Sequence, residues 1–236
     1  MLNETFYLDG IDARSAGIQL QAPIEFGEAV PVVEAQTIPG RNGDLIWETG
    51  SYENRSGSAS CFCLQKDVGK AVSSAGRFLM GKKGYRRLET SDDPDHYWMA
   101  RVENSPRIEQ RLRMLAPFEI GFDCKPQRFV KSGENAVVFT DNGSLFNQYG
   151  QIALPFITLY GQGAGRLTIG DCVVDVKALN GVLYLDSDTQ NAYNDSGNQN
   201  LNINAPTFPV LGDGEVQIAF SGGIERVEII PRWWEL

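Results

Sequence analysis

Short runs of alternating apolar and polar residues, closed by glycines, recur along almost the whole chain. In the stretch GEVQIAF, Val216, Ile218 and Phe220 occupy every second position. A period of two places apolar side chains on one face of a β-strand. The same alternation occurs near the beginning of the sequence, where Ile18 and Leu20 lie in GIQLQ. Most of the 25 glycines separate such runs, so the pattern predicts an all-β protein with many turns.

One segment follows a helical period instead. In residues 67–80 the apolar residues recur at intervals of three and four: Val68, Ala71, Val72, Ala75, Phe78 and Leu79. This spacing predicts one amphipathic helix whose apolar stripe packs against a sheet rather than holding a cofactor. Asp67 is expected to cap its first turn and Gly81 to end its last.

The polar, turn-rich stretch KSGENAVVFTDNGS separates two halves of the chain. After it come six short β-like runs with turns between them, which predict a sandwich or jelly roll of about 100 residues. We therefore expect a mainly β fold in two domains, with the boundary near residues 131–140. Residues 1–134 would form a β domain with the helix near 67–80, and residues 135–236 a β-sandwich.

Charge and cysteine usage narrow the range of partners. The net charge of -9 opposes general binding to nucleic acid or to an anionic membrane. The sequence has no run of 18 apolar residues and no secretory signal, which predicts synthesis and folding in a cytoplasm. The spacing of the four cysteines suits neither a disulfide nor zinc, so we expect free, mostly buried thiols at Cys61, Cys63, Cys124 and Cys172.

A catalytic imidazole could only be His96, the single histidine of the chain. It lies in the stretch DDPDHYW, where Asp93 and Asp95 flank it and could orient it. The same aspartates with Pro94 are also a strong turn signal, and no G-x-S-x-G motif accompanies them. A turn is therefore the favoured interpretation, and no catalytic residue is expected.

Two further motifs fail the tests for a ligand site. The stretch DSDTQNAYND offers Asp186, Asp188 and Asn191, but an EF-hand loop needs Gly where Asn191 stands and Glu where Gly197 stands. A polar hairpin loop is the better interpretation. The glycine-rich stretch at residues 161–165 lacks the G-K-[ST] of a phosphate loop and precedes a β-like run, so we expect a hairpin tip. No metal or cofactor is expected, which favours a binding or assembly protein.

The stretch IPGRNGDLIWETG carries the turn dipeptides Pro39-Gly40 and Asn42-Gly43. Between β-like runs, Asn-Gly predicts a hairpin with a type I′ turn. No Lys-Ser or Lys-Thr follows, so a phosphate site is not expected. Two interpretations stay open for this loop: a pre-shaped, charged contact with another protein, or a solvated turn whose charges contribute little.

Four stretches in order resemble the distal tail protein (Dit) family of long-tailed, siphovirus-type phages and prophages. They are IPGRNGDL, DDPDHYWMARV, FDCKPQRF and the terminal IERVEIIPRWWEL, and the similarity spans nearly the whole chain. The resemblance implies an N-terminal β domain with a helix that assembles into a homohexameric ring, followed by a galectin-like C-terminal β-sandwich. The second half has no room for the inserted carbohydrate-binding domain of some members.

The resemblance also implies partners and a place in the virion. In the family the ring joins the tail tube protein to the tail-tip hub or tail-associated lysin, and in many phages it holds receptor-binding proteins. We therefore expect a structural protein of the phage tail tip, made in the host cytoplasm, with no enzymatic activity. Arg41, Asn42, Gly43 and Asp44 are the candidate residues for contact between subunits.

Two other hypotheses remain open from sequence. A carbohydrate-binding β-sandwich that recognises cell-surface sugars could use an aromatic platform drawn from Tyr184, Tyr193, Trp233 and Trp234. A glycosidase would need two carboxylates at a set separation, which sequence alone does not give. The single histidine and the missing catalytic motifs weigh against any enzyme.

Overall fold

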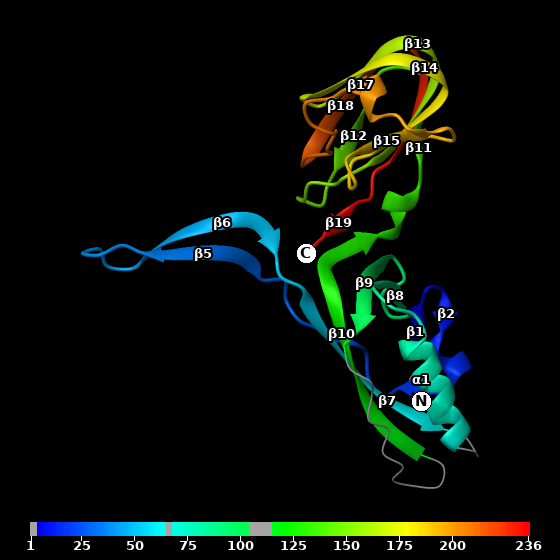
Figure 1. Ribbon diagram of the computed structural model, residues 1–236. Helices are drawn as coiled ribbons and strands as arrows, with labels where there is room; N and C mark the ends of the chain where they lie inside the picture. The colour runs from blue at the N-terminus through cyan, green and yellow to red at the C-terminus, as the bar shows by residue number, and fades with distance from the viewer. Residues whose placement is uncertain (1–3, 65–67, 104–114) are drawn as a thin grey trace. The chain divides into compact units, whose positions relative to one another are not determined.

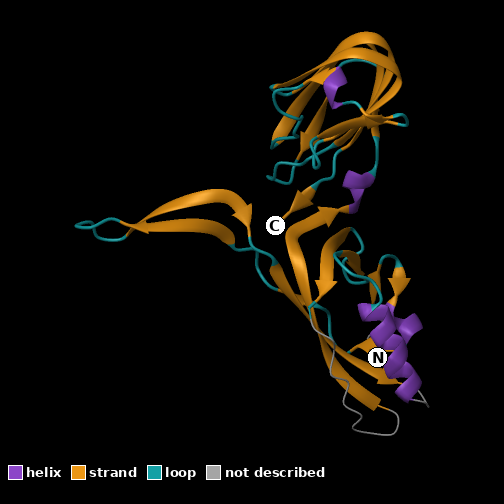
Figure 2. Ribbon diagram, viewed as in Figure 1, coloured by secondary structure: helices purple, strands orange, loops and turns teal. Residues whose placement is uncertain are grey.

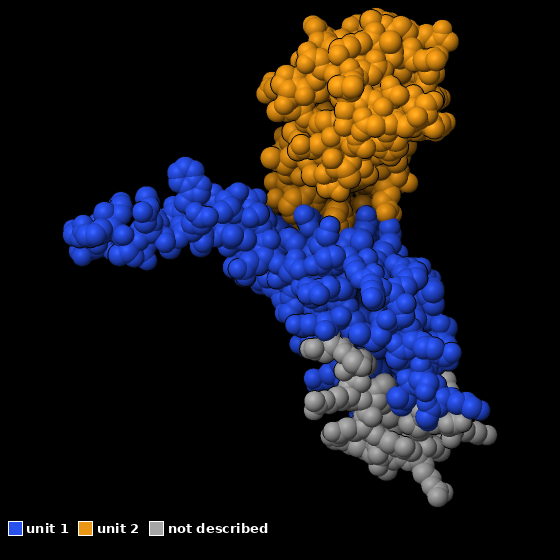
Figure 3. All heavy atoms as spheres, in the orientation of Figure 1, with its two compact units in different colours: residues 1–128, 236 blue, residues 129–235 orange. Residues whose placement is uncertain are grey.

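The computed structural model describes residues 4–64, 68–103 and 115–236. The described chain is mainly β-strand with one α-helix, as predicted. It divides into two compact units, drawn in different colours in Figure 3: unit 1 is Met1–Arg128 with Leu236, and unit 2 is Phe129–Glu235. This division falls before the expected boundary segment, and the galectin-like character of the second domain stays a prediction.

Unit 1 is built on a sheet with the strand order β2-β1-β8-β9-β10-β7-β3, and β4 also pairs with β7. Strands β10 and β7 run antiparallel from Leu115 opposite Leu64 to Cys124 opposite Arg55. The elements are β1 (Phe6–Leu8), β2 (Ile11–Asp12), η1 (Ala13–Ala16), β3 (Ile18–Leu20), β4 (Glu25–Phe26), β5 (Pro31–Thr37), β6 (Asp44–Tyr52), β7 (Arg55–Leu64), α1 (Val68–Met80), β8 (Arg86–Thr90), β9 (His96–Val102) and β10 (Leu115–Val130).

The predicted amphipathic helix is α1, and Figures 1 and 2 show it beside the sheet of unit 1. Its stripe is buried as expected: Ala71 and Ala75 are fully covered and Leu79 nearly so, in one core with residues of the sheet. The helix ends at Met80, directly before Gly81. The expected cap, Asp67, lies outside the described residues. The period of 3.6 was therefore sufficient to place this element.

Unit 2 contains a sheet with the order β11-β18-β13-β14-β15-β16, to which β12 adds on β18 and β17 on β14. Its largest strands are curved, as Figure 1 shows. Its described buried apolar residues form one core cluster. The elements are η2 (Lys131–Glu134), β11 (Val137–Phe139), β12 (Gly143–Asn147), β13 (Phe156–Ile169), β14 (Cys172–Asp186), β15 (Asn191–Asn194), β16 (Gly197–Asn198), η3 (Asn200–Asn202), β17 (Ile203–Asn204), β18 (Gly214–Ile230) and β19 (Trp234–Glu235).

The expected pattern of short strands in unit 2 was wrong in one respect. The glycine-rich stretch 161–165 is not a hairpin tip but the middle of β13, which continues through it and pairs on both sides with β14 and β18. The pairing register of β13 shifts there, so the glycines form an irregular bend. A Cβ at Gly161 would lie 2.0 Å from the backbone oxygen of Gly223, so glycine permits the close approach of two strands.

Candidate functional site

Residues 31–52 form a hairpin of β5 and β6, which we call the arm. The strands pair from Thr37 opposite Asp44 to Pro31 opposite Tyr52 and form a two-stranded sheet of their own. Figure 2 shows the arm extending away from the main sheet of unit 1. Almost every residue of both strands is exposed, so neither face of the arm is covered by the subunit itself. An isolated two-stranded hairpin is marginally stable in water, which makes an uncovered arm unusual.

The tip of the arm confirms the predicted hairpin but not its turn type. The loop has six residues, 38–43, rather than two. The N–H of Arg41 donates to the carbonyl of Ile38 at 3.1 Å, and Gly40 has φ 83°, which is typical of a type II turn with proline in second position. Gly43 has φ 79°, but Asn42 is not among the non-glycine residues with positive φ, so a type I′ turn is excluded. The turn at Pro39-Gly40 therefore redirects the chain before it reaches Asn42-Gly43.

The four candidate contact residues, 41–44, lie together at this tip and are all exposed. The carboxylate of Asp44 accepts a hydrogen bond from the hydroxyl of Thr37 at 2.7 Å. Within the described chain, neither Arg41 nor Asp44 makes an ion pair. The tip therefore presents one cation and one anion whose charges are free to meet a partner.

The arm also exposes large apolar side chains, which sequence reasoning did not single out. Trp47 is 71% exposed and Ile46 is 62% exposed; Val33 and Leu45 are also exposed. Successive residues of a strand point to opposite faces, so Ile46 and Trp47 make both faces of the arm apolar. The signal in the sequence was the uninterrupted run Leu45-Ile46-Trp47, which a half-buried strand would not carry.

The root of the arm is fixed to the sheet. The amide of Asn54 donates to the carboxylate of Asp123 at 2.9 Å and to the hydroxyl of Tyr85 at 2.5 Å. The N–H of Glu53 donates to the carbonyl of Val30 at 2.8 Å, which closes the base of the hairpin. These hydrogen bonds fix the positions at which the arm enters and leaves the sheet.

His96 lies at the start of β9, beside the predicted turn. Its Nδ1 is 2.7 Å from the carboxylate of Asp93, whose second oxygen accepts from Nε of Arg128 at 3.1 Å. Burial raises the pKa of Asp93, but the hydrogen bonds from His96 and Arg128 outweigh it, so the pKa of this carboxyl lies below its ordinary value. Asp95 is exposed. The group ties the turn to β10, as a structural ion pair does.

The residues considered for calcium form a hairpin loop between β14 and β15. The carboxylate of Asp186 accepts from Arg232 at 2.6 Å and from the N–H of Asp188 at 3.2 Å. The amide oxygen of Asn191 accepts from Asn198 at 2.9 Å. Across the described residues no group of three or more His, Cys, Asp or Glu side chains is arranged to hold a metal ion. The polar hairpin interpretation is confirmed.

The four aromatic residues considered for sugar binding are not one platform. Tyr184 and Tyr193 face each other across β14 and β15 with ring centroids 5.4 Å apart, and both are half-buried. Trp233 belongs to the core of unit 2. The indole N–H of Trp234 donates to the carbonyl of Ile152 at 3.0 Å. Only the two tyrosines, next to Phe156, form a continuous aromatic surface.

All four cysteines are free, as predicted, and three of them are buried. Desolvation raises the pKa of Cys61 to about 12 and that of Cys124 to about 12, so these thiols stay protonated at neutral pH. None of the helices in the described segments is long and apolar enough to cross a membrane.

Comparison with known proteins gives one result at the level of the fold. No protein-family model and no curated protein matches the sequence. A solved structure with the same fold is that of SPP1 Dit (gp 19.1), described as a paradigm of the hub adsorption apparatus in phages that infect Gram-positive bacteria. The TM-score is 0.74 at 14% identity, and the match covers 96% of this chain and 98% of that one. The resemblance to distal tail proteins is thus confirmed for the fold.

Proposed function

We propose that this chain is a structural protein of a phage tail tip, a distal tail protein that joins the tail tube to the hub of the adsorption apparatus. The observation that carries the proposal is the shared fold with SPP1 Dit over 96% of the chain. The four motifs that suggested the family support it independently. Its place would be the virion, and its role would be assembly rather than catalysis.

Assembly would proceed through a homohexameric ring of unit 1, with the arm as a contact between neighbours. Fully burying a side chain such as Leu or Ile contributes about 1.5–3 kcal/mol, so covering Leu45, Ile46 and Trp47 is a substantial driving force. In a ring each subunit meets its neighbours through two different surfaces. An arm that reaches outside its own subunit supplies one of them. The tail tube protein, a hub or lysin protein and receptor-binding proteins would be the further partners.

The native mass of the purified protein tests the ring. We expect a hexamer in native mass spectrometry or analytical ultracentrifugation, with the oligomer fraction rising with concentration. A protein that stays monomeric at every concentration would contradict assembly of the chain on its own. The test should therefore be repeated in the presence of the tail tube protein.

Paired variants test the tip of the arm. Removing both tip charges by Arg41→Ala and Asp44→Ala should weaken the ring without changing the melting of the subunit. At an interface, truncating a desolvated charge costs about 2–5 kcal/mol, whereas exposed charges rarely change stability by more than about 0.5 kcal/mol. The control removes the exposed ion pair of Arg166 and Asp175 in unit 2, which are joined at 2.6 Å, and so makes the same change in charge.

If the tip variant assembles like the control, the tip is a solvated turn and the apolar strands of the arm must carry the contact. Trp47→Ser distinguishes this case, because it removes the most exposed apolar side chain of the arm. We expect it to weaken the ring and to leave the subunit folded, since a residue that is 71% exposed contributes little to the subunit.

A second candidate function is sugar binding by unit 2. The observation in its favour is the pair Tyr184 and Tyr193, whose half-exposed rings lie beside Phe156 on neighbouring strands. Aromatic rings of this kind can stack on the apolar face of a sugar. Glycan-array binding that is lost in Tyr193→Ala would support it. Equal binding by that variant would leave unit 2 without a sugar site at the tyrosines.

A further inference from the structure

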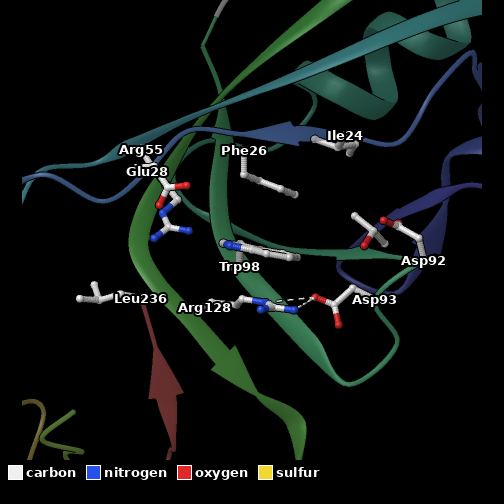
Figure 4. Close-up of a pocket in the computed structure, with 10 residues that line it drawn as sticks. Ile24, Phe26, Glu28, Arg55, Asp92, Asp93, Trp98, Arg128 and Leu236 are labelled. Carbon is white, nitrogen blue, oxygen red and sulfur yellow. Dashed lines mark hydrogen bonds and ion pairs between the residues drawn. The ribbon is translucent and has the colours of Figure 1, made fainter. Parts of the chain in front are cut away.

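A cleft of about 470 Å³ lies in unit 1 at the root of the arm. Figure 4 shows the side chains that line it. Phe26 and Glu28 come from the segment that leads into β5, and Arg55 is the first residue of β7, directly after the arm returns. The segments that flank the arm on both sides therefore contribute to the wall of this cleft.

One side of the cleft consists of groups that contact one another. The ring of Phe26 stacks on Trp98 with centroids 4.1 Å apart and an interplanar angle of 12°. The guanidinium of Arg128 lies 5.6 Å from the centroid of the Trp98 ring, and its Nε donates to the carboxylate of Asp93. Figure 4 shows these three side chains as successive layers. In this stack the guanidinium of Arg128 is already paired with the carboxylate of Asp93.

The hydroxyl of Thr90 and the indole nitrogen of Trp98 are buried in the lining without a partner, and among the described lining residues the charged one with such atoms is Arg55. Its side chain points into the cleft and the residue is only 7% exposed, yet its Nε and Nη2 are buried without any hydrogen-bond partner. Glu28 lies nearby in the lining but makes no ion pair with it in the described structure. A buried charge without a partner is strongly unfavourable, so such groups are nearly always paired.

A second buried arginine of unit 1 has hydrogen-bond partners for its guanidinium and so provides a comparison. Arg86 is 6% exposed, almost as buried as Arg55. Its Nε donates to the carboxylate of Asp9 at 3.0 Å, and its Nη1 donates to the carbonyl of Phe78 at 2.7 Å. The fold thus provides partners for one buried guanidinium and leaves two nitrogens of the other without any.

We propose that the cleft is a binding site for a carboxylate of a second copy of this chain, presented by that copy's arm. A guanidinium offers a planar fork of donors that matches a carboxylate in two hydrogen bonds. The arm carries three exposed carboxylates, Glu34, Asp44 and Glu48, and none of them makes an ion pair in the described chain.

The apolar parts of the two surfaces match as well. On the arm, Ile46 lies between Asp44 and Glu48 on one face, because side chains two residues apart share a face. The lining of the cleft also contains the apolar residues Ile24, Phe26 and Leu236. An arm that enters the root of the next arm makes a head-to-tail contact, and such contacts repeat around a ring. This inference rests on the proposed function, since it requires self-association.

The test compares Arg55→Met with Arg86→Met. Methionine keeps much of the side-chain volume and removes the charge. In dissociated subunits, Arg55→Met should melt at or above the wild-type temperature, because it removes an unpaired charge. Arg86→Met should melt lower, because it removes the hydrogen bonds to the carboxylate of Asp9 and to the carbonyl of Phe78, although Asp9 keeps its contact with Lys82. In self-association, Arg55→Met should raise the dissociation constant at least about tenfold, as expected for loss of a charged hydrogen-bonded pair.

The arm's contribution is tested by Glu34→Gln, Asp44→Asn and Glu48→Gln in one variant, alone and combined with Arg55→Met. If the carboxylates meet Arg55, the two changes share one interaction, and the combined variant should be no weaker than the worse of the two. Additive effects would overturn the arm as the occupant.

The remaining outcomes separate the two proposals. A wild-type ring that Arg55→Met leaves unchanged overturns the cleft and leaves the proposed function standing. A wild-type protein that never self-associates, even with the tail tube protein, overturns the ring, and with it a second copy as the occupant. Arg55→Met melting as low as Arg86→Met would show that Arg55 is a structural residue of the subunit.

Discussion

Several glycines of unit 2 have a φ outside the positive range, so alanine could replace them without backbone strain. Among these glycines, we expect the replacement of Gly223 by alanine to destabilise unit 2 most. A Cβ at this position would lie 1.9 Å from the backbone oxygen of Gln162, whereas real Cβ atoms essentially never come within 3.0 Å of such an atom. Strands β13 and β18 would therefore have to separate locally by about 1 Å. Hydrogen bonds weaken steeply over such a distance.

The expected loss follows from three contributions. Overpacking a close contact costs about 1–3 kcal/mol. Breaking one or two bonds of the strand ladder costs about 1 kcal/mol each. Replacing glycine stabilises by about 0.4–1 kcal/mol, because the unfolded chain loses freedom. The net loss is about 1–5 kcal/mol, which lowers the melting temperature of a unit of this size by at least about 4 °C.

Gly212→Ala is the matched control. It adds the same methyl group in the same unit, but a Cβ there meets no atom within 4 Å, and its φ is not in the positive range. We expect it to melt at or slightly above the wild-type temperature. The assay is thermal unfolding by circular dichroism. If Gly223→Ala melts within about 2 °C of Gly212→Ala, the close crossing of β13 and β18 is not a packing constraint, as a shift that small is below about 1 kcal/mol.

Three further outcomes are expected. All four thiols should react with a thiol reagent in denaturant without reductant, while Cys61 and Cys124, with pKa values near 12, should stay unreactive in the folded protein at pH 8; a count below four contradicts free thiols. Burial raises the pKa values of Asp9 and Asp93, but the hydrogen bonds that these carboxylates accept outweigh it and lower both pKa values, so their stabilisation should be complete above about pH 5 and decline as pH falls below the unfolded value of about 3.9. A urea midpoint that rises between pH 6 and pH 3 would contradict this, and Asp93→Asn should flatten the decline. Trypsin should cut dissociated subunits first after Arg41, in the exposed six-residue loop of the arm, and a first cut within α1 would show that the arm is covered.

The elements that sequence predicted well are those whose signal is local. The helix followed from the spacing of Ala71, Ala75 and Leu79, and the hairpin of the arm followed from two turn dipeptides between β-like runs. The strands of unit 2 were cut too short because a glycine cluster looks the same at a hairpin tip and at a bend within a strand. At Gly161 the strand continues because it pairs with residues from distant parts of the chain, Gly181 and Ile224, which the local sequence does not reveal.

The contacts of the candidate site are also of two kinds, those that local sequence predicts and those that depend on the fold. The tip residues and the contact between Asp93 and His96 lie within a few positions of each other, so a turn brings them together. Arg128 reaches the same carboxylate from 35 residues away, which depends on strand order and register. Arg55 shows no signal at all in the sequence, since its burial and its lack of a partner arise only once β7, β9 and the segment before β5 surround it.

The two features that most distinguish this chain are both unfavourable in an isolated subunit. The arm leaves Trp47 and Ile46 in water, and its root leaves Arg55 buried without a hydrogen-bond partner for two of its nitrogens. In natural sequences such departures from local rules concentrate where the molecule has a function beyond folding. Here both occur on one structural element, at its strands and at its root. A single event, the meeting of one subunit's arm with the next subunit's cleft, would act on both, because it covers the face of the arm that carries Ile46 and pairs the guanidinium. Assembly would then be driven by what the subunit leaves unsatisfied, and variants that remove the unsatisfied groups should produce a more stable subunit that assembles less well.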